Sequence, residues 1–207
     1  MKKLIILSVL LFSIVFVSQA QMKSGIKVGY GVADARGMGD TDGKTSFKIG
    51  VSSDIYLSKF FGLRPALYIS NKGYEKAVVG ATLKTSANYL ELPVCFALKL
   101  PLTKNIRVSA NAGPYFAYGI GGKTKIKGIE VNEKWKTFEG KTIDDIEYAA
   151  VERFDWGGTF AFSIGLFAIN IGINYDLGLK NIYKMQKPDR RENMKNGMWW
   201  FSVGFLF

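Results

Sequence analysis

The chain of 207 residues contains no histidine and a single cysteine, Cys95. Without an imidazole, the serine–histidine–acid arrangement of lipases and acyl hydrolases has no general base. Zinc sites built on histidine are excluded for the same reason, and one cysteine replaces neither the missing ligands nor the second half of a disulfide. The sequence therefore argues against an enzyme and predicts no metal and no cofactor.

The chain also lacks a long apolar run after its first twenty residues. Within these, Lys2 and Lys3 precede the apolar stretch 4–17, and Ser18-Gln19-Ala20 supplies small residues behind it. This order is typical of a secretory signal peptide cut after Ala20. An uncleaved anchor is the alternative, although the stretch is shorter than the roughly 20 residues of a spanning helix. We expect a signal peptide over 1–20 and one exported domain over 21–207.

Acidic residues are too few to balance the basic ones, and the formal net charge is +11. The basic residues are dispersed, with no basic helix and no recognisable nucleic-acid module, so we predict no nucleic-acid partner. For an exported chain, anionic lipid headgroups and lipopolysaccharide are the expected partners of this charge.

Beyond residue 20, apolar and polar residues alternate with a period of two, as in half-exposed β-strands. The last strand shows the pattern most clearly, because Trp199, Phe201, Val203, Phe205 and Phe207 form one apolar face. Eight such segments are predicted, over 26–33, 47–57, 63–70, 89–100, 106–118, 154–166, 169–180 and 199–207. An even number of strands suits a barrel made from one chain.

The connections between these segments alternate in length. Three are short (58–60, 101–104 and 167–168) and four are long (34–45, 71–85, 121–153 and 181–197). Short periplasmic turns and longer extracellular loops are typical of outer-membrane barrels. The sequence therefore predicts an all-β fold, an eight-stranded antiparallel up-and-down transmembrane β-barrel whose last strand pairs with the first around 26–32.

The two faces of the strands decide between this barrel and a soluble, lipocalin-like one with its apolar face inside. An eight-stranded barrel has room for side chains or one small ligand, and the apolar face carries too many large side chains to fit. The other face is rich in small residues and also carries charges that we expect to pair in the lumen: Lys48, Asp54, Arg64, Glu91, Lys99, Arg107, Asp155 and Asp176. The alternative use of these carboxylates is acid–base chemistry by Glu91 with Asp54 or Asp176.

Two of the long connections offer candidate contact residues. In 121–153, Ile146 and Tyr148 continue the alternation, so we expect a hairpin or a short helix above the membrane. Trp135, Phe138 and Tyr148 are candidate anchors for a protein partner, or else pack on each other to order the loop. In 181–197, the candidate contacts to anionic lipid are Lys184, Lys187, Arg190 and Arg191, unless that loop is merely solvated.

The segment Asn88-Tyr89-Leu90-Glu91-Leu92-Pro93-Val94 resembles the PorT-like family of outer-membrane β-barrels. Members share a Tyr-Leu-Glu-apolar-Pro strand, a signal peptide and an aromatic C-terminus. The resemblance implies an eight-stranded barrel assembled by the outer-membrane insertion machinery. One branch of the family is linked to protein secretion and gliding.

We therefore expect an outer-membrane protein without enzymatic activity that serves as a structural or binding module through its outer loops. The alternative is an accessory component of a secretion or surface-assembly complex. A diffusion pore is not expected, because side chains fill the lumen of an eight-stranded barrel.

Overall fold

The structure is a computed structural model that describes residues 22–37, 41–78, 81–128, 132–143, 146–148, 150–183 and 193–207. The predicted signal peptide lies outside these residues. In the described part of the chain no helix has the length and apolar character needed to cross a membrane.

Eight strands form a closed antiparallel barrel, and three shorter strands lie beyond it. The barrel strands are β1 (Met22–Arg36), β2 (Asp42–Tyr56), β3 (Phe61–Val78), β4 (Ala81–Pro101), β5 (Ile106–Gly128), β9 (Phe154–Leu166), β10 (Ile169–Gly178) and β11 (Lys195–Leu206). The shorter strands are β6 (Asn132–Lys136), β7 (Lys141–Ile143) and β8 (Ile146–Tyr148). The predicted fold class is confirmed.

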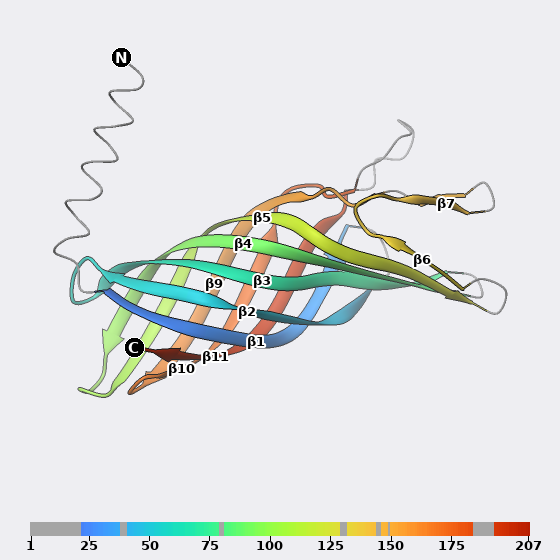
Figure 1. Ribbon diagram of the computed structural model, residues 1–207. Helices are drawn as coiled ribbons and strands as arrows, with labels where there is room; N and C mark the ends of the chain where they lie inside the picture. Colours follow the sequence, from blue (N-terminus) through green and yellow to red (C-terminus); the bar gives the residue numbers. More distant parts are fainter. Residues whose placement is uncertain are drawn as a thin grey trace, which may run out of the picture.

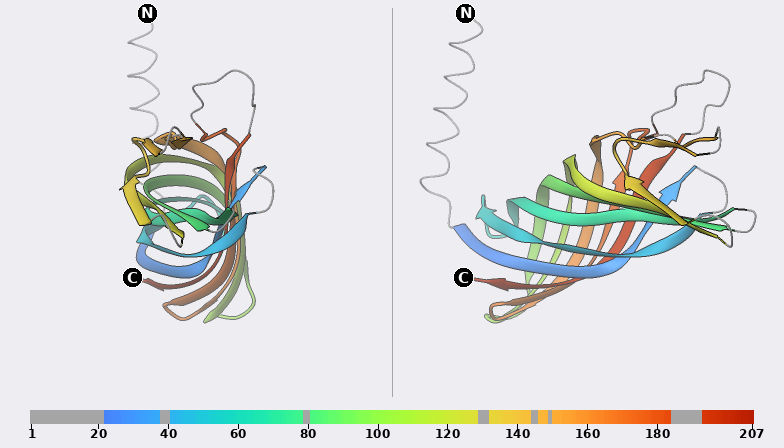
Figure 2. Two further views of the ribbon diagram at one scale, coloured as in Figure 1. Left: turned by 90° about the vertical axis from the view of Figure 1, so that its right-hand side faces the viewer. Right: turned by 45° about the vertical axis from the view of Figure 1, so that its right-hand side comes forward.

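The barrel closes by pairing its first strand with its last. In the β1–β11 register, Ile26 lies opposite Phe205 and Val32 opposite Trp199, as predicted. The remaining strands pair in chain order, and β4 pairs with β5 to complete the ring. Figure 1 shows β1 and β11 side by side, and the end-on view in Figure 2 shows the ring.

The polarity of the two faces is the reverse of that in a soluble barrel. On β9, the outward Phe160, Phe162 and Ile164 are 49, 50 and 44% exposed, while the inward Thr159 and Ser163 are 8 and 2% exposed. The same alternation runs round the wall, so the apolar band faces out and the polar side chains fill the interior. The predicted orientation of the faces is confirmed.

The end of the barrel with the short connections is called the turn end here, and the other the loop end. At the turn end, β9 and β10 are joined by Phe167 and Ala168 alone, with Phe167 at a φ of 53°. At the loop end, two of the predicted long loops are wrong in extent. β1 and β2 occupy most of 34–45, and β3 and β4 occupy all of 71–85 except residues 79 and 80.

The reason is that the apolar residues move from the outer face of the strands to the inner face near the loop end. On β4, Leu90 and Leu92 face out and Glu91 faces in, whereas nearer the loop end Lys84 faces out and Leu83 faces in. The inward apolar residues there form the loop-end cluster: Ala35, Tyr74, Leu83, Ile126, Val151, Ile182 and Met194. The sequence pattern used to predict the strands, an apolar outward face, therefore ends before the strands themselves end.

The predicted connection 121–153 is a pair of hairpins. β5 runs on to Gly128 and pairs with β6, and β7 pairs with β8 in a separate two-stranded sheet. The expectation of a hairpin in this segment is confirmed. Figure 1 shows β6 and β7 projecting past the ring.

Candidate functional site

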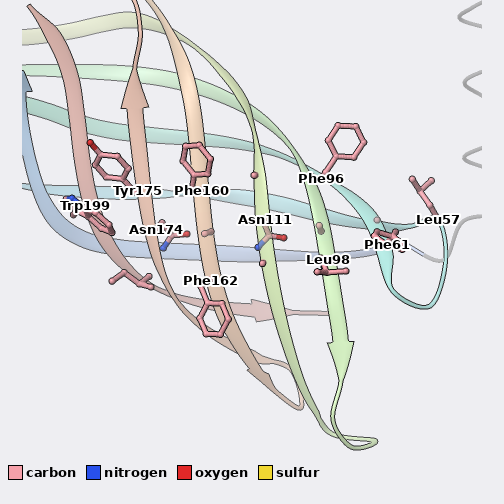
Figure 3. Close-up of a pocket in the computed structure, with 16 residues that line it drawn as sticks. Leu57, Phe61, Phe96, Leu98, Asn111, Phe160, Phe162, Asn174, Tyr175 and Trp199 are labelled. Atoms are coloured by element: carbon pink, nitrogen blue, oxygen red, sulfur yellow. The ribbon is translucent and has the colours of Figure 1, made fainter.

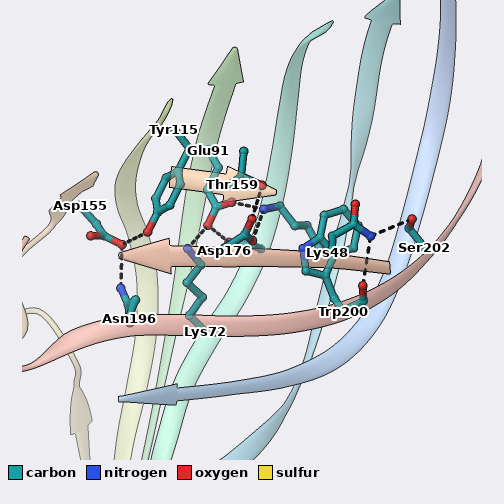
Figure 4. A network of polar contacts seen from close by, with 12 residues as sticks. Lys48, Lys72, Glu91, Tyr115, Asp155, Thr159, Asp176, Asn196, Trp200 and Ser202 are labelled. Carbon is teal, nitrogen blue, oxygen red and sulfur yellow. Dashed lines mark hydrogen bonds and ion pairs between the residues drawn. The ribbon is translucent and has the colours of Figure 1, made fainter. Parts of the chain in front are cut away.

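The middle of the lumen is held by ion pairs between strands on opposite sides of the barrel (Figure 4). Lys48 on β2 forms ion pairs with Glu91 on β4 and with Asp176 on β10, the latter with Nζ and Oδ2 2.7 Å apart. Lys72 on β3 places its Nζ 2.6 Å from Oε1 of Glu91. Thr159 donates a hydrogen bond to Asp176. These contacts tie β2, β3, β4, β9 and β10 together across the interior.

A second cluster lies near the turn end. Arg64 donates from Nη2 to Oδ2 of Asp54 over 2.9 Å, with Nε on the other carboxylate oxygen. Lys99 places its Nζ 3.3 Å from the same Oδ2 and lies over the ring of Tyr56, 3.6 Å from its centroid. One carboxylate is thus shared by two cations at this depth.

A fourth carboxylate, Asp155, lies toward the loop end. Its Oδ2 accepts hydrogen bonds from Tyr115 over 3.1 Å and from Asn196 over 2.9 Å. Arg107 was expected in the paired lumen network, but it is not part of it. Its guanidinium lies against Gly165, and in the described ranges it makes no ion pair.

The interior also contains buried cations outside the predicted set, among them Lys72 and Lys27. Lys72 falls in a segment that was expected to be a loop. Lys27 shares the inward parity of β1, but its neighbours on that face are glycines, so it did not stand out. Lys27 donates to Oδ1 of Asn174 over 2.9 Å and lies 4.8 Å from the ring centroid of Trp200. Inward parity alone would have identified Lys27.

A small cavity lies among these side chains. This cavity of about 30 Å³ is lined by Lys27, Lys48 and Arg64 together with uncharged residues. Asn111 and the indole Nε1 of Trp200 also line it, and neither has a hydrogen-bond partner among the described residues. This volume admits one or two water molecules. In the part of the chain that the structure describes, no three acidic or cysteine side chains gather as a metal site.

The loop-end residues predicted as partner anchors lie mostly inside the fold. Trp135 is half-buried against the loop-end cluster. Phe138 lies edge-on to Tyr89, with ring centroids 5.8 Å apart, and the Arg153 guanidinium lies 4.9 Å from its centroid. For these two residues the structure shows the packing role that the sequence left open. Tyr148 is on β8, and its side chain lies outside the described part.

The predicted lipid contacts Lys184, Lys187, Arg190 and Arg191 also lie outside the described residues. They stay a prediction.

The outer wall carries a groove with a volume of about 630 Å³ (Figure 3). It runs over β5, where Ala110 and Ala112 are small, between Phe96 on β4 and Phe162 on β9. Tyr175 and Trp199 stack at its other end, with ring centroids 4.4 Å apart. Its lining is mainly apolar, so it fits acyl chains and offers no acid–base pair.

A filled lumen inside a wall with an apolar exterior defines a transmembrane β-barrel without an open channel. The chain belongs to the family described as outer membrane protein beta-barrel domain, whose model matches residues 17–184. It is therefore an outer-membrane protein. No significant match is found among curated proteins.

Several solved outer-membrane structures resemble the chain. One is Ail, the attachment invasion locus protein of Yersinia pestis, in complex with the heparin analogue sucrose octasulfate. It has 13% identity and a TM-score of 0.47, covering 90% of this chain and 99% of that one. Neisserial surface protein A has 10% identity and a TM-score of 0.49, and the match covers 91% of this chain and 99% of that one. The outer membrane enzyme PagL has 9% identity and a TM-score of 0.46, and the match covers 86% of this chain and 98% of that one.

Proposed function

We propose that this protein is a non-enzymatic module of the outer membrane, structural or binding, that acts through its loop end. In barrels of this kind the short turns face the periplasm and the longer connections face the exterior. The observation that carries the proposal is the packed loop end. β3, β4 and β5 continue past the apolar band and, with β6, enclose the loop-end cluster.

A packed loop end supports binding because it is already ordered before a partner arrives. Ordering a loose loop on binding would cost free energy that a preorganised surface does not lose. Among the described residues, β7 and β8 pair with each other and with no other strand, and β8 carries Tyr148. We propose this hairpin, with Tyr148, as the contact to a protein partner.

The occupied state of the lumen carboxylates supports the absence of catalysis. Glu91 is fully buried and bound by two lysines, and Asp54 is 1% exposed and bound by Arg64 and Lys99. A general acid or base must reach its substrate within hydrogen-bond distance. These carboxylates are closed off by their own counter-ions, so a structural role explains them better.

The test replaces residues 141–148 by a short Gly-Ser linker in the full chain, followed by cross-linking and capture from gently solubilised membranes. The parent protein is expected to retain a surface partner that the variant loses. Both should keep heat-modifiable gel migration, which reports a folded barrel. The matched control replaces the turn 102–105 by the same linker and should retain the partner.

Two results would contradict the proposal. One is release of a cleaved product when the purified parent is incubated with outer-membrane lipid or surface glycan. The other is capture that is identical with and without the hairpin. Recovery of a stoichiometric assembly with secretion proteins would instead favour the accessory role.

A further inference from the structure

Six lysines are brought to one face of the sheet at the loop end. They come from three strands and are called the lysine face: Lys84, Lys123, Lys125, Lys127, Lys134 and Lys136. The strand register places Lys125 directly opposite both Lys84 and Lys134. Lys123 lies directly opposite Lys136. Like charges in directly opposed positions destabilise a sheet, so this arrangement costs folding free energy in the absence of an anion.

Most of the lysine face has no internal counter-ion. Lys84 pairs with Glu75, and Lys136 pairs with Glu139 over 2.9 Å. The other four make no ion pair with a carboxylate of the described residues. The positive charges of Lys123 and Lys125 hold the pKa of Lys134 below its usual value. The repulsion is therefore present in the folded protein and would be relieved by an external anion.

The lysine face points sideways from the barrel. On β4, Lys84 lies on the same side of the strand as Leu90 and Leu92, which belong to the outward apolar band. The residues between the lysines, among them Ile126 and Trp135, point inward to the loop-end cluster. The lysines therefore continue the outward side of the wall beyond the apolar band, where the headgroup region of the outer leaflet is expected.

We propose that the lysine face binds the phosphate groups of lipopolysaccharide molecules that stand next to the barrel in the outer leaflet. Successive lysines on one strand are about 7 Å apart, and opposed lysines on paired strands about 5 Å apart. This grid presents several ammonium groups to a headgroup that carries more than one phosphate. The lysine face consists of other residues than the predicted lipid contacts in 184–191, and the proposal deepens the proposed function because it names a ligand for the loop end.

The test titrates the full-length barrel in neutral detergent with solubilised lipopolysaccharide and counts bound lipid by native mass spectrometry. The variant removes three charges from the lysine face: Lys123→Gln, Lys125→Gln and Lys134→Gln. The matched control removes three exposed charges from the turn end: Lys23→Gln, Lys59→Gln and Lys104→Gln. Parallel titrations use dephosphorylated lipopolysaccharide and a soluble sulfated polysaccharide.

The lysine-face variant is expected to bind lipopolysaccharide about a hundredfold more weakly, since each lysine near an anionic surface contributes about a factor of five. The control should bind within about twofold of the parent. Dephosphorylated lipid should bind the parent as weakly as the intact lipid binds the lysine-face variant.

Equal affinity of the two variants would overturn the proposal, as would equal binding of dephosphorylated lipid by the parent. Binding of the soluble polysaccharide in preference to the lipid would also overturn it, in favour of a soluble ligand. None of these results affects capture of a partner through 141–148, so the inference and the proposed function fail separately. Cleavage of the bound lipid would contradict the proposed function alone.

Discussion

At the scale of single residues, the stability of the interior depends on which buried charges have a partner of opposite sign. Lys48 is shared by two carboxylates, Glu91 by two lysines, and Asp54 by an arginine and a lysine. Breaking a buried pair by removing one member leaves the other charge buried without compensation. By contrast, an exposed pair contributes little, because water screens it. The two kinds of pair are therefore expected to respond very differently to the same substitution.

Glu91→Gln is expected to destabilise the barrel by about 3–5 kcal/mol, since Lys72 loses its carboxylate partner in a buried site. Urea unfolding in lipid, followed by the gel shift between folded and unfolded forms, measures the change. The matched control Glu75→Gln breaks the exposed pair with Lys84 and should cost less than about 1 kcal/mol. Equal effects of the two substitutions would contradict a buried network.

Lys27 and Lys48 lie in the same cavity wall but have different partners. Lys27 has the neutral Asn174, whereas Lys48 neutralises Asp176. We expect Lys27→Met to change the free energy of unfolding by less than about 1 kcal/mol, because no anion is left uncompensated. We expect Lys48→Met to cost about 3 kcal/mol. The same unfolding measurement compares them, and the reverse order would show that Lys27 carries a counter-ion.

At the scale of the elements, the strands change the side on which they are apolar. Within the apolar band, lipid requires apolar side chains outside and the narrow lumen accepts polar ones inside. Beyond the band, water lies outside, and the loop-end cluster supplies an ordinary apolar core inside. Phe138 lies where the two regimes meet, on Tyr89 and Gly119. The loop end is therefore expected to depend on this contact more than the barrel does.

Gly119→Ala tests this junction. A Cβ at Gly119 would lie 2.2 Å from the ring of Phe138, which must then move, whereas a Cβ at Gly121 meets no atom within 4 Å. We expect limited proteolysis of the segment 129–153 to become several-fold faster in Gly119→Ala, with the barrel still heat-modifiable. Gly121→Ala is the control and should be cleaved at the parental rate. Parental cleavage of both would show that Phe138 does not order the loop end.

At the scale of the whole molecule, closure and filling go together. Pairing of β1 with β11 removes both free edges of the sheet, which a hydrocarbon environment requires. The ring is narrow enough for side chains to fill it, and the cavity beside Lys27 and Lys48 has a volume of about 30 Å³. Side chains thus occupy the interior of the barrel, and we expect its partners to bind at its outer surfaces.

In planar bilayers the purified protein is expected to show no stable, large conductance, because ion pairs among four strands cross the lumen. Glu91→Gln should leave this unchanged as long as the barrel is folded. An open 16-stranded porin in the same bilayer is the positive control. Reproducible large conductance steps from the parent protein would contradict the filled lumen.

The sequence determined by itself which residues form strands in the apolar band and which face each residue occupies. Phe162 and Ser163 are adjacent, and lipid outside and a narrow lumen inside impose opposite polarity on neighbours, so the pattern has a period of two. Most of the lumen charges were predicted for the same reason, and the closing pair of strands followed from their even number.

The tertiary structure alone decided which of these residues meet. Lys48 and Asp176 are far apart in the chain, and they pair only because ring closure brings β2 and β10 to face each other across the lumen. Strand extension past the band was hidden by the change of apolar side at Leu83. The lysine face likewise exists only through the register that aligns Lys84, Lys125 and Lys134, since a local pattern carries no information about pairing between strands.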